Sequence, residues 1–291
     1  MSAPASPEAA IALNPSAAPR PVALIQPSRG FLRLNLGQVW EYRELLYFLV
    51  WRDVKVRYKQ TAIGAIWAIL QPLLTMMIFA LIFGRFAKIP SDNVPYPIFA
   101  FAGLLPWTYF SQATSRSGMS LVGDANLIRK IYFPRLVIPL SSAVAPVIDF
   151  ALSFGILLIM MVWYKVTPTW AVLSLPFFLC LSVFAALGTS LWLSALNVRY
   201  RDVTHAIPFL VQIWMYASPI VYPTSIIPKA WRPYYSLNPI AAVADGFRWG
   251  LLGKPTPDLQ EIVLGSVVTL VMLVSGLIFF KRLERTFADV V

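Results

Sequence analysis

The chain has very little of the chemistry that most enzymes use. Its 291 residues include one cysteine, Cys180, and one histidine, His205. A single cysteine excludes a disulfide framework and a multi-thiolate metal site, and a single histidine excludes most histidine-based zinc or catalytic sites. Charged residues make up only 13% of the chain, against about 25% in soluble proteins. We therefore expect no catalytic residues, no metal site and no soluble globular domain.

Hydrophobic residues dominate what remains. They make up 58% of the chain, and the mean hydropathy is +0.67. These values indicate a multi-pass membrane protein. The net charge of +11 would also suit a nucleic-acid binder. In a hydrophobic chain, however, cytoplasmic loops and anionic lipid headgroups explain a basic excess more simply. We expect membrane lipids, and no nucleic acid, as partners.

The two ends of the chain are predicted to be cytoplasmic tails. Residues 1–36 are rich in Ala, Pro and Ser and have too few apolar residues to bury a core, so we expect them to be disordered. They lack the basic start and apolar stretch of a signal peptide, and the chain is expected to be inserted by its own spans. Residues 286–291 form the second tail, which leaves 37–285 as the transmembrane domain.

Six segments are long and apolar enough to cross a membrane as helices, which takes about 20 residues. We predict an all-α polytopic protein with spans at about 61–84, 96–116, 137–163, 170–196, 205–223 and 260–280. Between the last two spans, residues 229–253 have no uncharged run of that length and are interrupted by Pro233 and Pro239. A re-entrant helical hairpin is expected there.

The basic residues predict the orientation. With six spans and both termini in the cytoplasm, sixteen Lys and Arg residues fall on inside segments and seven on outside segments. A seventh crossing would place one basic end of the chain outside, so we predict six spans.

Residues 41–60, before the first span, are predicted to form an amphipathic helix at the membrane interface. Tyr47, Val50, Trp51, Val54 and Tyr58 fall on one stripe at helical spacing, and the charged residues project elsewhere. The alternation of Val54 to Lys59 would also suit a strand. An isolated strand beside a bilayer, however, has no partner for its backbone groups.

No energy source for transport is apparent in the chain itself. Gly253-Lys254 lacks the upstream glycine and the following Ser or Thr of a Walker A loop. The mid-span Asp149 is the one candidate for ion coupling, and it is equally explained as a structural hydrogen-bond acceptor on a neighbouring helix.

Five ordered blocks, within about residues 38–285, resemble a known family. They read ELLYFLVWRDVKVRYKQTAIGAIWAILQPLL, GLLPWTYF, LVGDANLIRKIYFPRLVIPL, LWLSALNVRYRDVTHAIPFLVQIWMYASPIVYP and YYSLNPIAAVADGFRWGLLG. They are similar to the membrane subunit of polysaccharide-exporting ABC transporters, the type-2 export permeases that include O-antigen, capsule and teichoic-acid exporters. The resemblance implies six spans, an interface helix and a re-entrant hairpin in a homodimer of the bacterial inner membrane. It also implies two copies of a cytoplasmic ATPase subunit, which carries the ATP and Mg²⁺, and a lipid-linked polysaccharide as substrate.

The resemblance also implies a segment that couples the permease to its ATPase, in the loop after the second span. The expected contact residues are Asp124, Asn126, Arg129, Lys130, Tyr132, Phe133 and Arg135. Asp124 is expected to cap a short helix that Pro134 ends. A plain positive-inside loop would explain the same charges.

Two further sets of residues have two interpretations each. Arg52, Lys55, Arg57 and Lys59 would either contact the pyrophosphate of a lipid-linked glycan or anchor the chain to anionic lipid. A group of aromatic residues would either line a glycan channel or form an interfacial belt. Its members are Trp107, Tyr109, Phe110, Trp214, Tyr216 and Tyr222.

The sequence thus predicts a permease subunit that exports a lipid-linked polysaccharide. One alternative is an ABC exporter of drugs or small lipids. The other is a membrane-embedded glycosyl- or acyltransferase, which would need convergent acids, bases or a metal site.

Overall fold

The computed structural model describes residues 36–59, 62–253, 256–284 and 287, and every regular element within them is a helix. The predicted tails at 1–36 and 286–291 therefore fall largely outside the described residues. At the C-terminal end, the ring of Phe287 is buried and lies 5.4 Å from that of Phe280. This part of the predicted C-terminal tail packs against the last helix.

Four helical segments of the described chain are long and apolar enough to span a membrane: Ile66–Phe86, Val137–Trp163, Trp170–Arg199 and Leu259–Glu284. They coincide with the first, third, fourth and sixth predicted spans. The first joins α3 (Ala62–Phe79) to the π-helix η2 (Ala80–Phe86), and the second joins α6 (Val137–Val144) to α7 (Val147–Trp163). The third joins the 3₁₀ helix η3 (Trp170–Ser174) to α8 (Leu175–Arg199), and the fourth is α12 (Leu259–Glu284).

The second and fifth predicted spans have a different character. Helix α4 (Tyr96–Gly123) has 28 residues but is less apolar, and α9 (Val203–Tyr216) has only 14 residues, or about 21 Å at the helical rise. Helix α4 is buried on most of its surface and packs against α3, α6, α7, α8, α9 and α11. Since protein rather than lipid surrounds it, α4 tolerates small polar residues such as Ser117 and Thr114.

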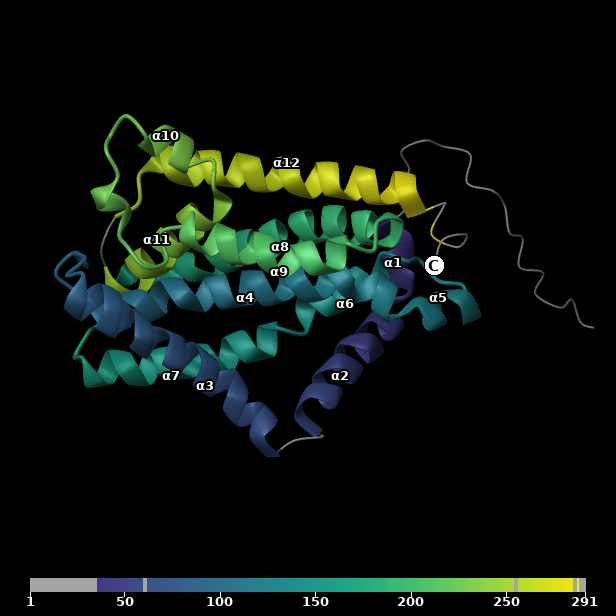
Figure 1. Ribbon diagram of the computed structural model, residues 1–291, viewed down its shortest axis with the longest axis horizontal. Helices are drawn as coiled ribbons and strands as arrows, with labels where there is room; N and C mark the ends of the chain where they lie inside the picture. The colour runs from purple at the N-terminus through teal and green to yellow at the C-terminus, as the bar shows by residue number, and fades with distance from the viewer. Residues whose placement is uncertain (1–35, 60–61, 254–255, 285–286, 288–291) are drawn as a thin grey trace, which may run out of the picture. The chain divides into compact units, whose positions relative to one another are not determined.

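Glycines allow α8 and α12 to pack closely, as Figure 1 shows for the two long helices. A Cβ atom added to Gly276 would lie 2.6 Å from the carbonyl oxygen of Gly188, and one added to Gly188 would lie 2.7 Å from the backbone nitrogen of Leu273. Small residues at such crossings are typical of helix packing in membranes.

The segment predicted to be re-entrant contains two helices, α10 (Arg232–Tyr235) and α11 (Pro239–Leu252), after the 3₁₀ helix η4 (Thr224–Ile226). The predicted break after Asn238 is confirmed, because the Asn238 side chain caps α11 by accepting a hydrogen bond of 3.1 Å from the Ile240 amide. Helix α11 ends at Gly253, whose φ of 74° suits glycine. Helix α11 is almost wholly buried against α4, α8 and α12.

The predicted helix before the first span is also confirmed, as α2 (Arg43–Lys59), which follows α1 (Leu36–Glu41). The face that packs against α6 differs from the predicted apolar stripe. Leu49 is buried there, whereas Tyr47 and Trp51 are 71% and 52% exposed. The helix contacts the protein through its leucines, and these two aromatic residues of the stripe face away from it.

Candidate functional site

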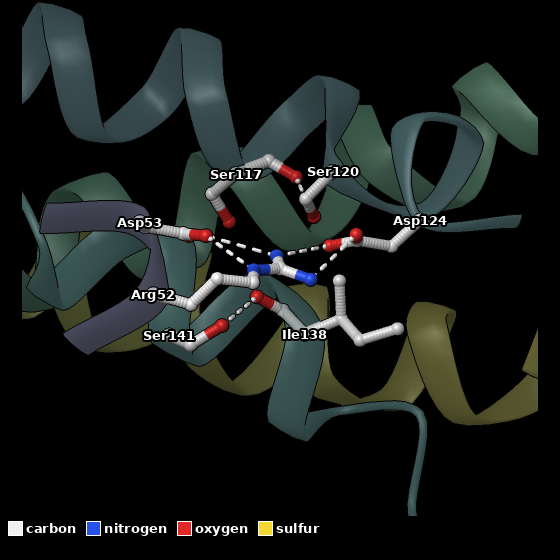
Figure 2. A network of polar contacts seen from close by, with 7 residues as sticks. All are labelled: Arg52, Asp53, Ser117, Ser120, Asp124, Ile138 and Ser141. Carbon is white, nitrogen blue, oxygen red and sulfur yellow. Dashed lines mark hydrogen bonds and ion pairs between the residues drawn. The ribbon is translucent and has the colours of Figure 1, made fainter. Parts of the chain in front are cut away.

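A charged network joins α2 to the end of α4, at the end of the bundle that carries α5 (Ala125–Lys130). Arg52 donates to both carboxylate oxygens of Asp124, from Nη1 and Nη2 at 2.9 Å each, and from Nε to Asp53 Oδ1 at 3.0 Å. Figure 2 shows the guanidinium between the two carboxylates. Hydrogen bonding to Asp124 raises the pKa of Arg52 above its ordinary value. The guanidinium is committed to these two acids.

A serine hydroxyl joins α4 to α6 beside this network. Ser117 donates to the Pro139 carbonyl at 2.8 Å, and Ser120 and Ser141 donate within their own helices, to Ser117 and Ile138 (Figure 2). Helix α2 packs against α6, and α6 is held to α4, so packing as well as Arg52 connects α2 with α4.

The predicted coupling segment contains the short helix α5, but its cap differs from the prediction. Asp124 occupies the N-cap position and makes no side-chain capping bond. Its carboxylate is turned to Arg52 instead, because a charged bidentate partner is a stronger donor than a backbone amide. The helix also ends at Lys130, before Pro134.

The other predicted coupling residues divide by exposure. Asn126, Arg129, Lys130 and Tyr132 are exposed, and Tyr132 is 87% exposed. Phe133 is buried, in a second core cluster with Leu136 and Phe280. Arg129 to Phe133 and Arg135 line a hollow of about 210 Å³. The segment therefore exposes basic and aromatic side chains, and Phe133 fixes it to the protein core.

Arg135 anchors the segment to the end of α12. Its backbone nitrogen donates to Glu284 Oε1 at 3.2 Å, and its guanidinium donates to the Glu284 carbonyl. Glu284 also forms an ion pair with Lys281, with 2.7 Å between Nζ and Oε2. The predicted contact residue Arg135 is thus held within the subunit.

The four basic residues predicted to contact pyrophosphate are not equivalent. Arg57 forms an ion pair with Asp149 of α7, and the Tyr58 hydroxyl donates to the same carboxylate. Burial lowers the pKa of Arg57. Of the two interpretations of Asp149, the geometry matches the structural acceptor. Lys55 and Lys59 are exposed on α2 and form no ion pair within the described residues.

A buried arginine, Arg248 of α11, is the centre of a second network that sequence reasoning missed. The prediction from basic residues places it on an outside segment, and the structure leaves it no exposed surface. It donates to Asp245 at 3.2 Å and to the carbonyls of Pro219 and Ile220 at 2.6 and 2.9 Å. Its Cζ lies 3.8 Å from the centre of the Phe99 ring. The i, i+3 spacing of Asp245 and Arg248 was the available sequence signal.

The predicted channel aromatics lie mostly inside the subunit. Trp107, Tyr109 and Phe110 are at most 4% exposed, and the ring of Phe110 packs edge-on against that of Trp214 at 5.1 Å. These three rings offer almost no surface to a channel in this conformation, because α4 is surrounded by other helices. Tyr216 is 56% exposed, and Trp214 and Tyr222 are half-buried. A lining role stays a prediction, and here it is best supported for Tyr216.

Known proteins are similar to this sequence over most of its length. Residues 44–252 match the family model described as ABC-2 type transporter. The O-antigen export system permease protein RfbA of Myxococcus xanthus is 30% identical, over 87% of this chain and 97% of its own length. RfbA of Klebsiella pneumoniae is 29% identical over 89% of this chain, and the polysialic acid transport protein KpsM of Escherichia coli is 25% identical over 80%. The chain belongs to the ABC-2 type transporter family.

Proposed function

We propose that this chain is the permease subunit of an ABC transporter that exports a lipid-linked polysaccharide, an O-antigen or a similar cell-surface glycan. The observation that carries the proposal is full-length similarity to export permeases: 30% identity over 97% of the length of RfbA from Myxococcus xanthus. The more distant match to KpsM, a polysialic acid transport protein, supports the broader class of glycan substrates.

The proposed assembly is a homodimer with two copies of an ATPase subunit, which binds ATP and Mg²⁺, in the inner membrane of a bacterium. We propose six spans with both termini in the cytoplasm. Helices α4 and α9 are the second and fifth of these, beside the four spans that are more apolar. The helices α10 and α11 form the re-entrant hairpin. The buried position of α11 supports this arrangement, since irregular or broken segments within a membrane need protein around them.

The proposed mechanism is gating by the ATPase. Nucleotide-driven closure of the ATPase dimer displaces the exposed residues Arg129, Lys130 and Tyr132. The displacement passes through Asp124 to Arg52 and the interface helix α2, and so shifts the spans between two conformations. Lys55 and Lys59, exposed on α2, are the proposed contacts for the pyrophosphate of the lipid carrier.

Deleting the gene and analysing surface glycan tests the proposal. We expect the deletion to abolish long surface polysaccharide and to leave lipid-linked glycan inside the cell, and a plasmid copy to restore export. Normal surface glycan in the deletion strain, with unchanged glycan pools, would contradict the proposal and favour an exporter of other molecules.

A further inference from the structure

A polar hollow lies at the end of the bundle that carries α10, opposite the end with α5 (Figure 1). Its volume is about 480 Å³. Its walls come from η4 and the segment after it, from α11, and from residues 256–258 with the first turn of α12. Its polar lining includes Lys229, Arg232, Ser236, Asp258, Gln260 and Glu261. None of the residues predicted from the sequence to bind glycan or pyrophosphate lies in this hollow.

Glu261, in the first turn of α12, gives the hollow an unused hydrogen-bond acceptor. Its side chain lines the hollow and the residue is only 7% exposed. Among the described residues, no group donates to its Oε1 atom. Burying a polar group without a partner is unfavourable, so this carboxylate favours a ligand that brings hydrogen-bond donors.

The charges around Glu261 exclude a simple anion site. Lys229, Arg232 and Asp258 form no ion pair within the part of the chain that the structure describes. Asp245, also in the wall, already accepts from Arg248 and Thr224. The hollow is therefore lined by both donors and acceptors. A phosphate would meet repulsion from the carboxylates, whereas a hydroxyl both donates and accepts.

Two exposed aromatic side chains stand beside the hollow. Trp231 and Tyr234 are 64% and 69% exposed, and their ring centres lie 5.9 Å apart. In the sequence they flank Arg232 and Pro233, which line the hollow. Exposed rings next to a polar hollow offer an apolar surface for the C–H face of a sugar, whose hydroxyls then reach the polar walls.

We propose that this hollow binds a short segment of a neutral glycan at the exit end of the permease. Glu261 and Asp258 accept from sugar hydroxyls, Lys229 and Arg232 donate to them, and Trp231 stacks against a sugar ring. The identity of the glycan rests on the proposed function. The binding chemistry rests on the hollow itself.

Calorimetry on the purified transporter, permease together with ATPase in lipid nanodiscs, tests the subsite. The probes are the lipid-free oligosaccharide released by mild acid from the cell's own surface polysaccharide, and inorganic phosphate. We expect the oligosaccharide to bind and phosphate not to compete. Glu261→Gln should weaken binding about tenfold, since it replaces one carboxyl oxygen by an amide nitrogen, which cannot accept a hydrogen bond. Trp231→Ala should weaken it about threefold to tenfold through lost stacking.

Matched controls change similar side chains elsewhere. Glu41→Gln alters an exposed carboxylate of α1, and Trp163→Ala alters a tryptophan at the end of α7 that is 82% exposed. Both should leave the affinity for the oligosaccharide unchanged. If Glu261→Gln fails to assemble, the Trp231→Ala variant decides the test, because its side chain is exposed and its loss should not affect folding.

The outcomes separate the subsite from the export function. No binding, competition by phosphate, or equal affinity in the wild type, Glu261→Gln and Trp231→Ala overturns the subsite. If the subsite is overturned in this way but the plasmid copy of the gene restores surface glycan to the deletion strain, the export function stands without the subsite. If both variants bind the oligosaccharide more weakly than the wild type, the subsite is supported. If the plasmid copy of the gene also fails to restore surface glycan, the export function is contradicted.

Discussion

Arg52 and Asp124 lie 72 positions apart in the sequence, and two parallel hydrogen bonds of 2.9 Å join them. The first residue belongs to α2, and the second joins α4 to the segment proposed to contact the ATPase. A bidentate pair of this kind constrains orientation as well as distance. The interface helix and the coupling segment are therefore expected to move together.

Removing the charge of Asp124 should uncouple glycan transport from ATP hydrolysis and should change the stability of the fold only slightly. Asp124→Asn leaves Arg52 paired with Asp53, so the free energy of unfolding should fall by about 1 kcal/mol or less. Glycan exported per ATP hydrolysed, measured in reconstituted vesicles, should fall clearly. Arg52→Gln should be non-additive with it, whereas Glu44→Gln, at an exposed position of the same helix, should have no effect. An unchanged export ratio in Asp124→Asn would contradict the coupling role.

Reversing the charges of the exposed basic residues of α5 should release the ATPase. Arg129→Glu combined with Lys130→Glu should reduce co-purification of the ATPase subunit and abolish export. Surface charges contribute little to folding, so the level of the permease should be retained. The matched control is Arg85→Glu with Lys88→Glu, two exposed residues in the last turn of the first span and just after it. Normal co-purification and export by the α5 variant would refute the assignment.

Breaking the buried pair on α11 should destabilise the permease strongly. Arg248→Met leaves Asp245 buried without its cation, a change that costs about 3–5 kcal/mol. Protein abundance and the temperature of aggregation in detergent should both fall. Adding Asp245→Asn should recover part of the loss, and Arg199→Met, at an exposed position, should be neutral. Full abundance of Arg248→Met would show that the pair is dispensable for folding.

Buried and exposed members of the predicted channel aromatics should respond differently to substitution. Phe110→Ala should lower protein abundance, because truncating a buried phenylalanine costs about 3–5 kcal/mol. Tyr216→Ala should keep abundance and dimer formation and slow the export of long glycans. Immunoblots and glycan chain-length profiles measure the two effects. Equal losses of abundance and export in both variants would favour packing or an interfacial belt over a channel lining.

Cysteine labelling tests the proposed topology. With Cys180 replaced by serine, Asn93→Cys should react with an impermeant reagent added to the periplasm. Asn126→Cys and Tyr200→Cys should react only after the cytoplasm is opened. All three positions are exposed, so the side of the membrane decides reactivity. Periplasmic labelling at position 126 would contradict six spans with both termini inside.

Much of the helical framework follows from local sequence. Long apolar runs with few charges predict spanning helices because the membrane interior offers no partners to a bare backbone. Helical spacing within residues 41–60 located α2 before the first span, and Pro239 predicted the interruption that precedes α11. The sequence did not distinguish spans two and five from the other four. In the structure, α4 is surrounded by protein and carries small polar residues, and α9 has only 14 residues.

The partners of the charged residues were decided only by the tertiary structure. From the sequence, Arg52 and Arg57 were equivalent members of a basic cluster with Lys55 and Lys59. Folding brings Asp124 and Asp149 to the two arginines and leaves the two lysines exposed. Likewise, the sequence placed Arg248 in the predicted re-entrant hairpin, and only the fold shows that α4 and the chain before η4 enclose its side chain. Local patterns determine which segments are helical, whereas electrostatic partners depend on contacts between residues far apart in the chain.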